Sequence, residues 1–547
     1  MKRNNLGING HLARTAAIAA AAAVLLFSIL AVPLHAEAGR IRRASSGSGD
    51  EQTQPAASDM IKASLLRQYD YEYDDDLGNV LDIYHDEIIL PEETSDKYPA
   101  LANTVEGYNK LFAERTEARK AELGETLKMM REGEYPFYGP LMDRQEIYIR
   151  RADPVCFSFV RYEETYDGGA HGYYSYFGIS TDPVTGDAIE LEQVVNDITV
   201  LPGILEAELK ENYPDAYFIG LEETLESYTE DPEYEDGPGQ GGFNWCLDPD
   251  GLTFFFSPYE IASYADGAME VTLLFNEYPE IFTGIYGGAK GGFAMNFPMF
   301  EKITYDAAGD GVPDTLMLAA YPDEYETYTE LSLFINDEEY IDDEIWAFEI
   351  RPVLFHTDGG RSFLYLELTE ENDYRTIEVY DLSGDEPEYA GHIDGGFAAD
   401  GAMQIYEKEW TGRVIASPAD PVEFGIEKRI QILSTMNCTM RCAVDDAGMP
   451  AELDDYWMIT NRRMAFTLKQ ETDFDRFDES GKVVDRGVSL PEGTKLYPYR
   501  TDTSGFVDVR TKDGTIYRVY VDTDDGWPQK VNGIGLEDLF DGVLFAG

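Results

Sequence analysis

A single histidine stands in a stretch whose side chains could bind a ligand, YDGGAHGYYSYF at residues 166–177. Asp167, Gly168 and Gly169 suit the positive φ angles of a hairpin connection, so a turn between two strands accounts for the glycines. It does not account for His171 or for the aromatic residues after it, which cannot all face one side of a strand. Such rings stack on sugars or cover a protein surface, whereas the alternative is a packed strand beside a turn. The candidate ligand-binding residues are His171, Tyr173, Tyr174 and Tyr176.

A second candidate site is the acidic stretch ITYDAAGDGVPDTLMLA at residues 303–319. Its acids fall at positions 1, 5 and 9 of a DxDxDGxxD loop with glycine at position 6, a spacing that wraps oxygen ligands around calcium. Position 3 is Ala308, so one ligand is missing and binding is expected to be weak. The alternative is a tight acidic turn between two strands. The candidate metal ligands are Asp306, Asp310 and Asp314.

Catalytic motifs are absent from the sequence, which has neither a GxSxG elbow nor an HExxH pair. The glycine-rich stretch at 284–293 is not a phosphate-binding loop, since Lys290 is followed by Gly291. Acidic pairs carry no information in a chain with 105 acidic residues, so a glycosidase pair distant in sequence would escape notice. We therefore predict a non-enzymatic protein without a cofactor, apart from weak calcium. The alternative is a hydrolase or deacetylase of cell-wall polysaccharide with unrecognised catalytic residues in 294–547.

Composition and charge limit the partners. The chain has 547 residues, 43% hydrophobic and 13% aromatic, which allows roughly two to four domains with packed cores. The formal net charge of −63 repels nucleic-acid phosphates and attracts cations and basic proteins. The cysteines allow three disulfide pairings, with buried free thiols as the alternative. They are Cys156, Cys246, Cys438 and Cys442, the last two on a helix predicted over 426–442.

The N-terminus has the features of a secretory signal. Lys2, Arg3 and Arg14 precede an apolar run at 16–32, and an A-x-A pattern follows at 36–38. The alternative is an uncleaved anchor, since the run reaches the short limit for spanning a bilayer. We expect an exported protein, extracellular or in the cell envelope, that contacts the membrane only if this segment is retained.

The periodicity of apolar residues predicts one long helix among many strands. Apolar residues recur at helical spacing from Leu101 to Met130, and we expect the helix to end near Gly133. Strands are expected on both sides of the YDGGAHG turn and again at AIELEQVV (188–195), followed by a helix over 201–213.

Two long strings resemble a known pair of modules: YDGGAHGYYSYFGISTDPVTGDAIELEQVV and GLTFFFSPYEIASYADGAMEVTLLF. Such modules of unknown function accompany the catalytic domain of PdaC-type peptidoglycan deacetylases and form the extracytoplasmic part of RsiV, the anti-sigma factor that senses lysozyme. The resemblance covers about residues 60–282 and rests on the GGAHG turn, the TGD turn and FSPYEIASYADG. It implies a mixed α+β fold and binding at the cell surface, either to a cationic protein such as lysozyme or to a cell-wall glycan.

The resemblance transfers no catalytic residue. A deacetylase needs an H-x-x-x-H metal motif, and no two histidines of this chain have that spacing; those after the signal segment at 1–38 are His85, His171, His356 and His392. Only about 14 residues precede the apolar run, which is far below an independently folding length, so we do not expect this chain to hold a sigma factor.

Together these patterns predict an α+β protein: mixed antiparallel-sheet modules with a long amphipathic helix, then a β-rich C-terminal region with an SH3-like small barrel. The expected divisions are a signal peptide or membrane anchor at 1–38, a flexible linker at 39–58, a first PdaC/RsiV-like module at 59–180, a second at 181–283, a glycine-rich joint at 284–293, a β-rich domain at 294–475 and a small β-barrel-like domain at 476–547. The predicted function is non-catalytic binding at the cell envelope.

Overall fold

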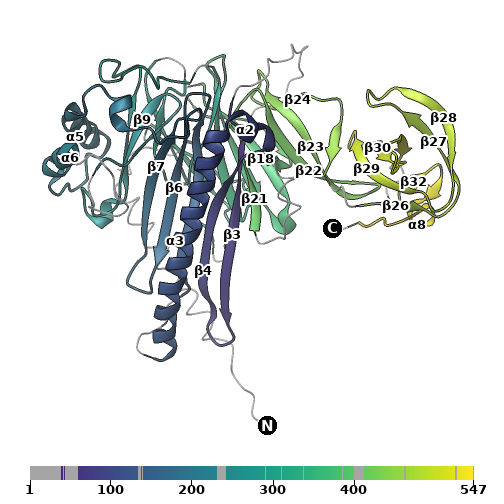
Figure 1. Cartoon of the computed structure of the whole chain (residues 1–547), viewed down its shortest axis with the longest axis horizontal. Coiled ribbons are helices and arrows are strands. Elements are labelled where there is room, and N and C mark those ends of the chain that lie inside the picture. Colours follow the sequence, from purple (N-terminus) through teal and green to yellow (C-terminus); the bar gives the residue numbers. More distant parts are fainter. Residues whose placement is uncertain are drawn as a thin grey trace, which may run out of the picture.

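The computed structural model describes residues 39–40, 42–43, 60–133, 137, 139–230, 242–289, 291–308, 311–323, 325–336, 338–384, 386–399, 412–460, 464–523 and 527–545. These residues form helices and mostly antiparallel sheets (Figure 1), which confirms the predicted α+β class. Across the described ranges, the model contains no helix with the length and apolarity needed to cross a membrane.

The first module is a sheet with a long helix against one face, in the strand order β21-β3-β4-β5-β6-β7. Its strands are β3 (Ala63–Asp74), β4 (Gly78–Ile89), β5 (Leu141–Ala152), β6 (Phe157–Tyr166), β7 (Tyr173–Thr181) and β21 (Gly412–Ser417). Strands β4 and β5 are parallel, and the crossover between them contains α2 (Glu92–Lys97) and α3 (Pro99–Arg131). The edge strand β21 comes from much later in the chain and pairs antiparallel with β3.

Helix α3 forms because apolar residues recur every three or four positions along it. Its buried side chains include Leu101, Val105, Phe112, Leu123, Leu127 and Met130. Phe112 meets Phe159 of β6 edge-on, with ring centroids 6.4 Å apart, so the helix covers the centre of the sheet. After the helix, Gly133 has a φ of +81°, a conformation that glycine adopts without strain. The predicted helix and its end near Gly133 are confirmed.

The second module packs helices against a three-stranded sheet of order β10-β9-β8. Its elements are α4 (Leu191–Val194), η1 (Ile198–Val200), α5 (Leu201–Asn212), α6 (Leu221–Glu230), β8 (Trp245–Leu247), β9 (Gly251–Phe256), η2 (Tyr264–Asp266) and β10 (Met269–Leu274). The predicted helix over 201–213 is confirmed as α5. The predicted strand at 188–195 is wrong, because the side chains of Glu190 and Gln193 form a capping box that starts the helical turn α4.

The two modules meet where β7 passes β8. A Cβ at Gly178 would lie 2.2 Å from the carbonyl oxygen of Trp245, so only glycine allows this approach. The Asn244 side chain accepts a hydrogen bond from the Gly178 backbone N–H (2.9 Å) and donates one to the carbonyl of Tyr176 (2.6 Å). The contact is therefore fixed by both sterics and hydrogen bonds.

Two further sheets follow the second module, in the orders β1-β15-β14-β13-β12 and β11-β16-β17-β18-β19-β2. Their elements are β1 (Gly39–Arg40), β2 (Arg42–Arg43), β11 (Phe293–Asn296), β12 (Ile303–Tyr305), β13 (Asp314–Ala319), β14 (Leu331–Ile335), β15 (Glu338–Asp342), β16 (Glu349–His356), β17 (Ser362–Thr369), η3 (Glu371–Asp373), β18 (Arg375–Asp381) and β19 (Glu388–Asp394). The glycine-rich joint before β11 is held by Arg151, whose guanidinium donates to the carbonyls of Tyr286 and Gly287, each at 3.0 Å.

The C-terminal region is a large open sheet of order β20-β22-β23-β25-β29-β30-β31-β27-β28. Figure 1 shows it running from β22 and β23, nearer the middle of the molecule, to β27 and β28 at the end opposite α5 and α6. Its elements are β20 (Gly396–Phe397), β22 (Phe424–Ile432), β23 (Ser434–Val444), β24 (Pro450–Glu452), β25 (Trp457–Ile459), β26 (Phe466–Leu468), β27 (Thr472–Phe477), β28 (Val483–Leu490), β29 (Lys495–Thr501), β30 (Phe506–Arg510), β31 (Ile516–Tyr520), β32 (Lys530–Val531), β33 (Ile534–Gly535), α8 (Leu536–Leu539) and β34 (Phe540–Asp541). The β-rich character is confirmed, but the described strands form no closed small barrel because the sheet path has two free ends.

The predicted helix over 426–442 is wrong, since these residues form the hairpin β22–β23. Every second side chain of β23 is buried, from Ser434 to Cys442, which is the period of a strand. All four cysteines are buried free thiols. Burial raises the pKa of Cys156, Cys438 and Cys442 to about 12, so these thiols stay protonated.

Candidate functional site: an aromatic stack where the two modules meet

The turn that contains His171 joins β6 to β7, as predicted from its glycines. Gly168 has a φ of +82°, and a Cβ there would lie 2.2 Å from the Met130 side chain of α3. His171 is exposed, and its Nδ1 lies 2.8 Å from the carbonyl oxygen of Gly172. The turn is thus held against α3 while the imidazole faces solvent.

The His171 ring lies on the ring of Tyr264, with centroids 4.2 Å apart and planes inclined by 30°. Tyr264 also contacts the ring of Tyr259, at 5.1 Å and 33°. The Tyr264 hydroxyl donates a hydrogen bond of 2.7 Å to the carbonyl of Gly172, next to the histidine. We call these three rings the aromatic stack. It brings together the GGAHG turn of the first module and the FSPYEIASYADG string of the second.

Tyr259 is held in an unfavourable backbone conformation. Its φ is +72° and its side chain is 59% exposed. It follows Pro258 in a turn closed from both sides, because the Glu260 backbone N–H donates to the Ser257 carbonyl (3.0 Å) and the Ser257 N–H donates to the Glu260 carboxylate (2.7 Å). A non-glycine residue in this region costs about 1–2 kcal/mol. The chain accepts this strain while presenting a tyrosine ring to solvent, a pattern associated with functional sites.

The three tyrosines predicted with His171 are largely inside. Tyr176 is 6% exposed and stacks on Phe255 of β9, with centroids 6.1 Å apart. The hydroxyl of Tyr174 accepts a hydrogen bond from the backbone N–H of Ala268. Tyr173 is half-buried, and burial is the main cause that raises its pKa to about 12. Tyr174 and Tyr176 join β7 to the second module, and His171 is the one exposed member of the four predicted residues, whereas Tyr173 and Tyr174 are half-buried. Ligand contact stays a prediction.

The turn of Tyr259 contacts α6, an acidic helix. The Glu260 carboxylate accepts a hydrogen bond of 2.6 Å from Tyr228 of α6, which ties this helix to the turn of Tyr259. Burial, followed by the neighbouring tyrosines, raises the pKa of Tyr264 to about 12, so its phenol is neutral. Helices α5 and α6 carry a single lysine, Lys210. Their glutamates are Glu206, Glu208, Glu211, Glu222, Glu223, Glu226 and Glu230.

Sequence reasoning missed Tyr259 and Tyr264 as site residues, although FSPYEIASYADG was one of the strings that carried the resemblance. The available signal was local. In a turn with proline at its second position, the third position often needs a positive φ and is usually glycine or asparagine. An aromatic residue that follows such a proline therefore takes this position, and its side chain points away from the core.

The predicted calcium loop is the turn between β12 and β13. Asp306 accepts a hydrogen bond of 2.9 Å from the backbone N–H of Gly311, and Asp314 accepts one of 3.1 Å from that of Ala307. Asp310 lies outside the described residues. No group of three or more metal-ligating side chains occurs in the part of the chain that the structure describes. Both described carboxylates thus cap the backbone of a tight turn, and calcium binding stays a prediction.

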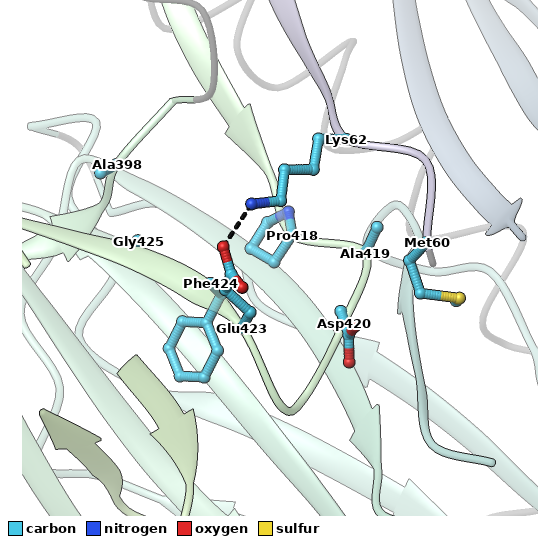
Figure 2. Close-up of a pocket in the computed structure, with 9 residues that line it drawn as sticks. All are labelled: Met60, Lys62, Ala398, Pro418, Ala419, Asp420, Glu423, Phe424 and Gly425. Carbon is cyan, nitrogen blue, oxygen red and sulfur yellow. Dashed lines mark hydrogen bonds and ion pairs between the residues drawn. The ribbon is translucent and has the colours of Figure 1, made fainter. Parts of the chain in front are cut away.

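A pocket lies where the start of β3 meets the connection between β21 and β22 (Figure 2). The Lys62 ammonium forms an ion pair with Glu423 across it, and Asp420 accepts a hydrogen bond of 2.9 Å from the backbone N–H of Val422. Its lining residues are Met60, Lys62, Ala398, Pro418, Ala419, Asp420, Glu423, Phe424 and Gly425. Because its charged groups bond to other groups of the protein, the pocket does not call for a ligand.

One serine–histidine pair has the composition of a nucleophile and its base. Nδ1 of His356 lies 3.0 Å from Oγ of Ser362. However, Ser362 is 0% exposed, and the imidazole stacks on Phe293 with centroids 5.1 Å apart. Burial also lowers the pKa of His356. A substrate could not reach this hydroxyl without a rearrangement of β16 and β17.

Residues 192–276 match the family model described as "Protein of unknown function (DUF3298)", so the chain carries a DUF3298 domain that includes Tyr259 and Tyr264. Among solved structures, the chain is similar to a DUF3298 family member from Bacteroides fragilis, at 19% identity over 41% of this chain and 94% of that one, with a TM-score of 0.31. It is also similar to a DUF3298 family protein from Pseudomonas aeruginosa, at 13% identity over 42% of this chain and 97% of that one, with a TM-score of 0.28. No curated protein matches the sequence.

Proposed function

We propose that this chain is an exported, non-catalytic binding protein of the cell envelope that recognises a cationic protein such as lysozyme. The observation that carries the proposal is the aromatic stack of His171, Tyr264 and Tyr259, exposed beside the acidic helix α6. The similarity of residues 60–282 to the extracytoplasmic modules of RsiV supports the choice of ligand. The DUF3298 match covers the half of the stack that comes from the second module.

The aromatic rings and the carboxylates of this surface have different roles in the proposed complex. Aromatic rings that leave water on contact supply much of the binding energy of protein interfaces, and tyrosine is enriched among such residues. Carboxylates around them accelerate the encounter with a basic partner and exclude acidic ones. The net charge of −63 makes the long-range attraction large at low ionic strength.

A cell-wall glycan is the second candidate ligand, and the exposed ring of Tyr259 is the observation that favours it. A sugar ring can stack on a tyrosine without any help from charge. An uncharged glycan would gain nothing from the glutamates of α6, so its binding would change little with salt. Ionic strength therefore separates the two ligands.

An enzyme is the remaining alternative, a cell-wall hydrolase or deacetylase with its catalytic residues in 294–547. Among the described residues, Ser362 is paired with His356 as a nucleophile would be with its base. Because Ser362 is buried, we favour a binding role. Incubation of the whole protein with peptidoglycan, with and without divalent metal, tests this point. Product formation that one carboxylate substitution abolishes would establish the enzyme instead.

The proposal is tested by titrating labelled lysozyme with the whole protein at about 20 mM and about 300 mM salt, across which screening increases strongly. We expect binding at low salt that weakens steeply at high salt. The double variant His171→Ala/Tyr259→Ala should weaken low-salt binding by at least about tenfold, as expected for the loss of interface anchors. Tyr73→Ala is the matched control, because Tyr73 is a 70% exposed tyrosine on β3, at the far side of the same sheet from β7.

Absence of lysozyme binding at low salt would overturn the cationic-protein proposal, and so would equal losses in the double variant and in Tyr73→Ala. Retention on insoluble peptidoglycan that ignores salt, but disappears in the double variant, would assign the same surface to a glycan.

A further inference from the structure

A carboxylic acid is buried where the DUF3298 domain meets the β-rich region that follows it. Glu270 belongs to β10 and is 7% exposed. Its carboxylate accepts a hydrogen bond of 2.5 Å from the backbone N–H of Lys302, just before β12. The neighbouring Glu301 is 1% exposed. Two acids from different parts of the chain therefore lie close together away from water.

Two cations lie near Glu270: Lys302, whose ammonium lies 5.9 Å from the ring centroid of Tyr213, and Arg150, which is already shared by other carboxylates. Arg150 of β5 is 1% exposed and donates from Nε and Nη2 to Asp248, at 2.9 and 2.7 Å, and from Nη1 to Glu301. The second oxygen of Glu301, Oε2, is buried and makes no hydrogen bond within the described structure. One guanidinium thus serves two carboxylates, and an ionised Glu270 would add a third negative charge.

We infer that Glu270 is a proton-controlled latch between the DUF3298 domain and the β-rich region: the contact is closed while this carboxyl carries a proton and loosens when the carboxyl ionises. The inference concerns the joint between two parts of the chain and does not depend on the ligand proposed above.

The electrostatic surroundings support this inference. Burial, and then the charge of Glu301, raises the pKa of Glu270 to about 8, although the Lys302 N–H and the charges of Lys302 and Arg150 act in the opposite direction. Burial also raises the pKa of Glu301, against the effect of Arg150. Two tyrosines also interact electrostatically with Glu270, and burial raises the pKa of both, so they are neutral. They are Tyr213 after α5 and Tyr176 of β7.

The direction of the pH effect follows from the raised pKa. A glutamate exposed to water has a pKa of about 4.3, so the opened joint releases the proton that the closed joint keeps. The closed state is therefore most stable below about pH 4.5 and loses stability as the pH rises toward about 8.

Hydrogen exchange of the whole protein at pH 5.5 and 8.5, corrected for the intrinsic pH dependence of exchange, tests the latch. We expect amides of β10 and of residues 299–307 to open at least about tenfold more at the higher pH, the effect of one pKa unit or more. Glu270→Gln keeps the shape of a protonated carboxyl at every pH and should remove this increase. Glu106→Gln, on the exposed face of α3, makes the same charge change elsewhere and should retain it.

Equal opening at both pH values in the unmodified protein would overturn the inference, as would a Glu270→Gln variant that still opens more at pH 8.5. If this variant fails to fold, carbon-13 titration of the glutamate carboxyls in the unmodified protein decides the matter. A glutamate that titrates near pH 8 and is coupled to the β10 amides supports the latch, whereas its absence refutes it.

Discussion

Replacing Arg150 by methionine should be among the most destabilising single changes in this protein. The side chain is 1% exposed and connects three parts of the chain. Arg150 belongs to β5 of the first module. Two of its guanidinium nitrogens donate to Asp248 of the second module, and the third donates to Glu301 of the β-rich region. Methionine fills a similar volume but leaves two buried carboxylates without their cation.

Removing one partner of a buried ion pair costs about 3–5 kcal/mol, because the remaining charge stays buried and uncompensated. Arg486→Met is the control, since Arg486 of β28 pairs with Asp475 at 3.2 Å, but its side chain is 76% exposed. Exposed pairs contribute about 0–1 kcal/mol. The structure therefore predicts a difference of at least about 2 kcal/mol between the two arginine-to-methionine changes.

Native-state hydrogen exchange of β5 and β9 measures this difference locally, without assuming that so long a chain unfolds in one step. Every tenfold rise in exchange corresponds to about 1.4 kcal/mol, so Arg150→Met should raise exchange there by at least about a hundredfold. Adding Glu301→Gln should recover part of the loss, because it removes one of the two orphaned charges. If Arg150→Met raises exchange no more than Arg486→Met does, the ion-pair reasoning is wrong.

Four other predictions follow from single features. Tyr259→Gly should stabilise the second module by up to about 1 kcal/mol in native-state hydrogen exchange of β9 and β10, because glycine tolerates a φ of +72°, while it weakens partner binding; a loss of protection would contradict the strain argument. Burial opposes ionisation of Glu146, but the charge of Arg67 prevails and lowers the pKa of Glu146 to about 2. The stability that this ionised group provides above pH 4.5 should therefore decline toward pH 2, and Glu146→Gln should flatten the decline. Plots of stability against pH that run parallel for the two proteins would refute this prediction. A thiol reagent should label no cysteine in the native protein and all four in denaturant, and fewer in denaturant would reveal a disulfide. Because Asp314 already caps the backbone, EDTA should not change the melting temperature, whereas a decrease that Asp314→Asn abolishes would establish a calcium site.

The sequence predicts best where local pattern and tertiary environment agree. Helix α3 has its buried residues at helical spacing, so its position and end follow from the residues themselves. The stretch 426–442 fails because its isoleucines, methionines and cysteines also fit a helix when read four residues apart, and the strand period becomes visible only through the burial of every second residue. AIELEQVV fails because a capping box outweighs its β-branched residues.

Only one part of the candidate site, the turn that contains His171, could be predicted from the sequence. The glycines around His171 indicate a turn. The ring of Tyr264, which contacts His171, lies far away in the sequence, and no local sequence pattern predicts such a contact. For the same reason the tyrosines after His171 suggested a binding surface, whereas Tyr176 packs on Phe255 of β9 and the Tyr174 hydroxyl bonds to the backbone of Ala268. A contact between distant segments decides which aromatic residues remain in solvent, and that information is not contained in either segment alone.

The origin of β21 has a consequence for how this chain acquires its shape. One edge of β3 pairs with β4, but the backbone groups of its other edge stay unpaired until residues 412–417 are added as β21. Such an unpaired edge invites pairing with other chains during synthesis. A truncated protein that ends after the DUF3298 domain would lack β21 and keep the edge of β3 unpaired. We expect it to precipitate in conditions under which the full-length protein stays dissolved.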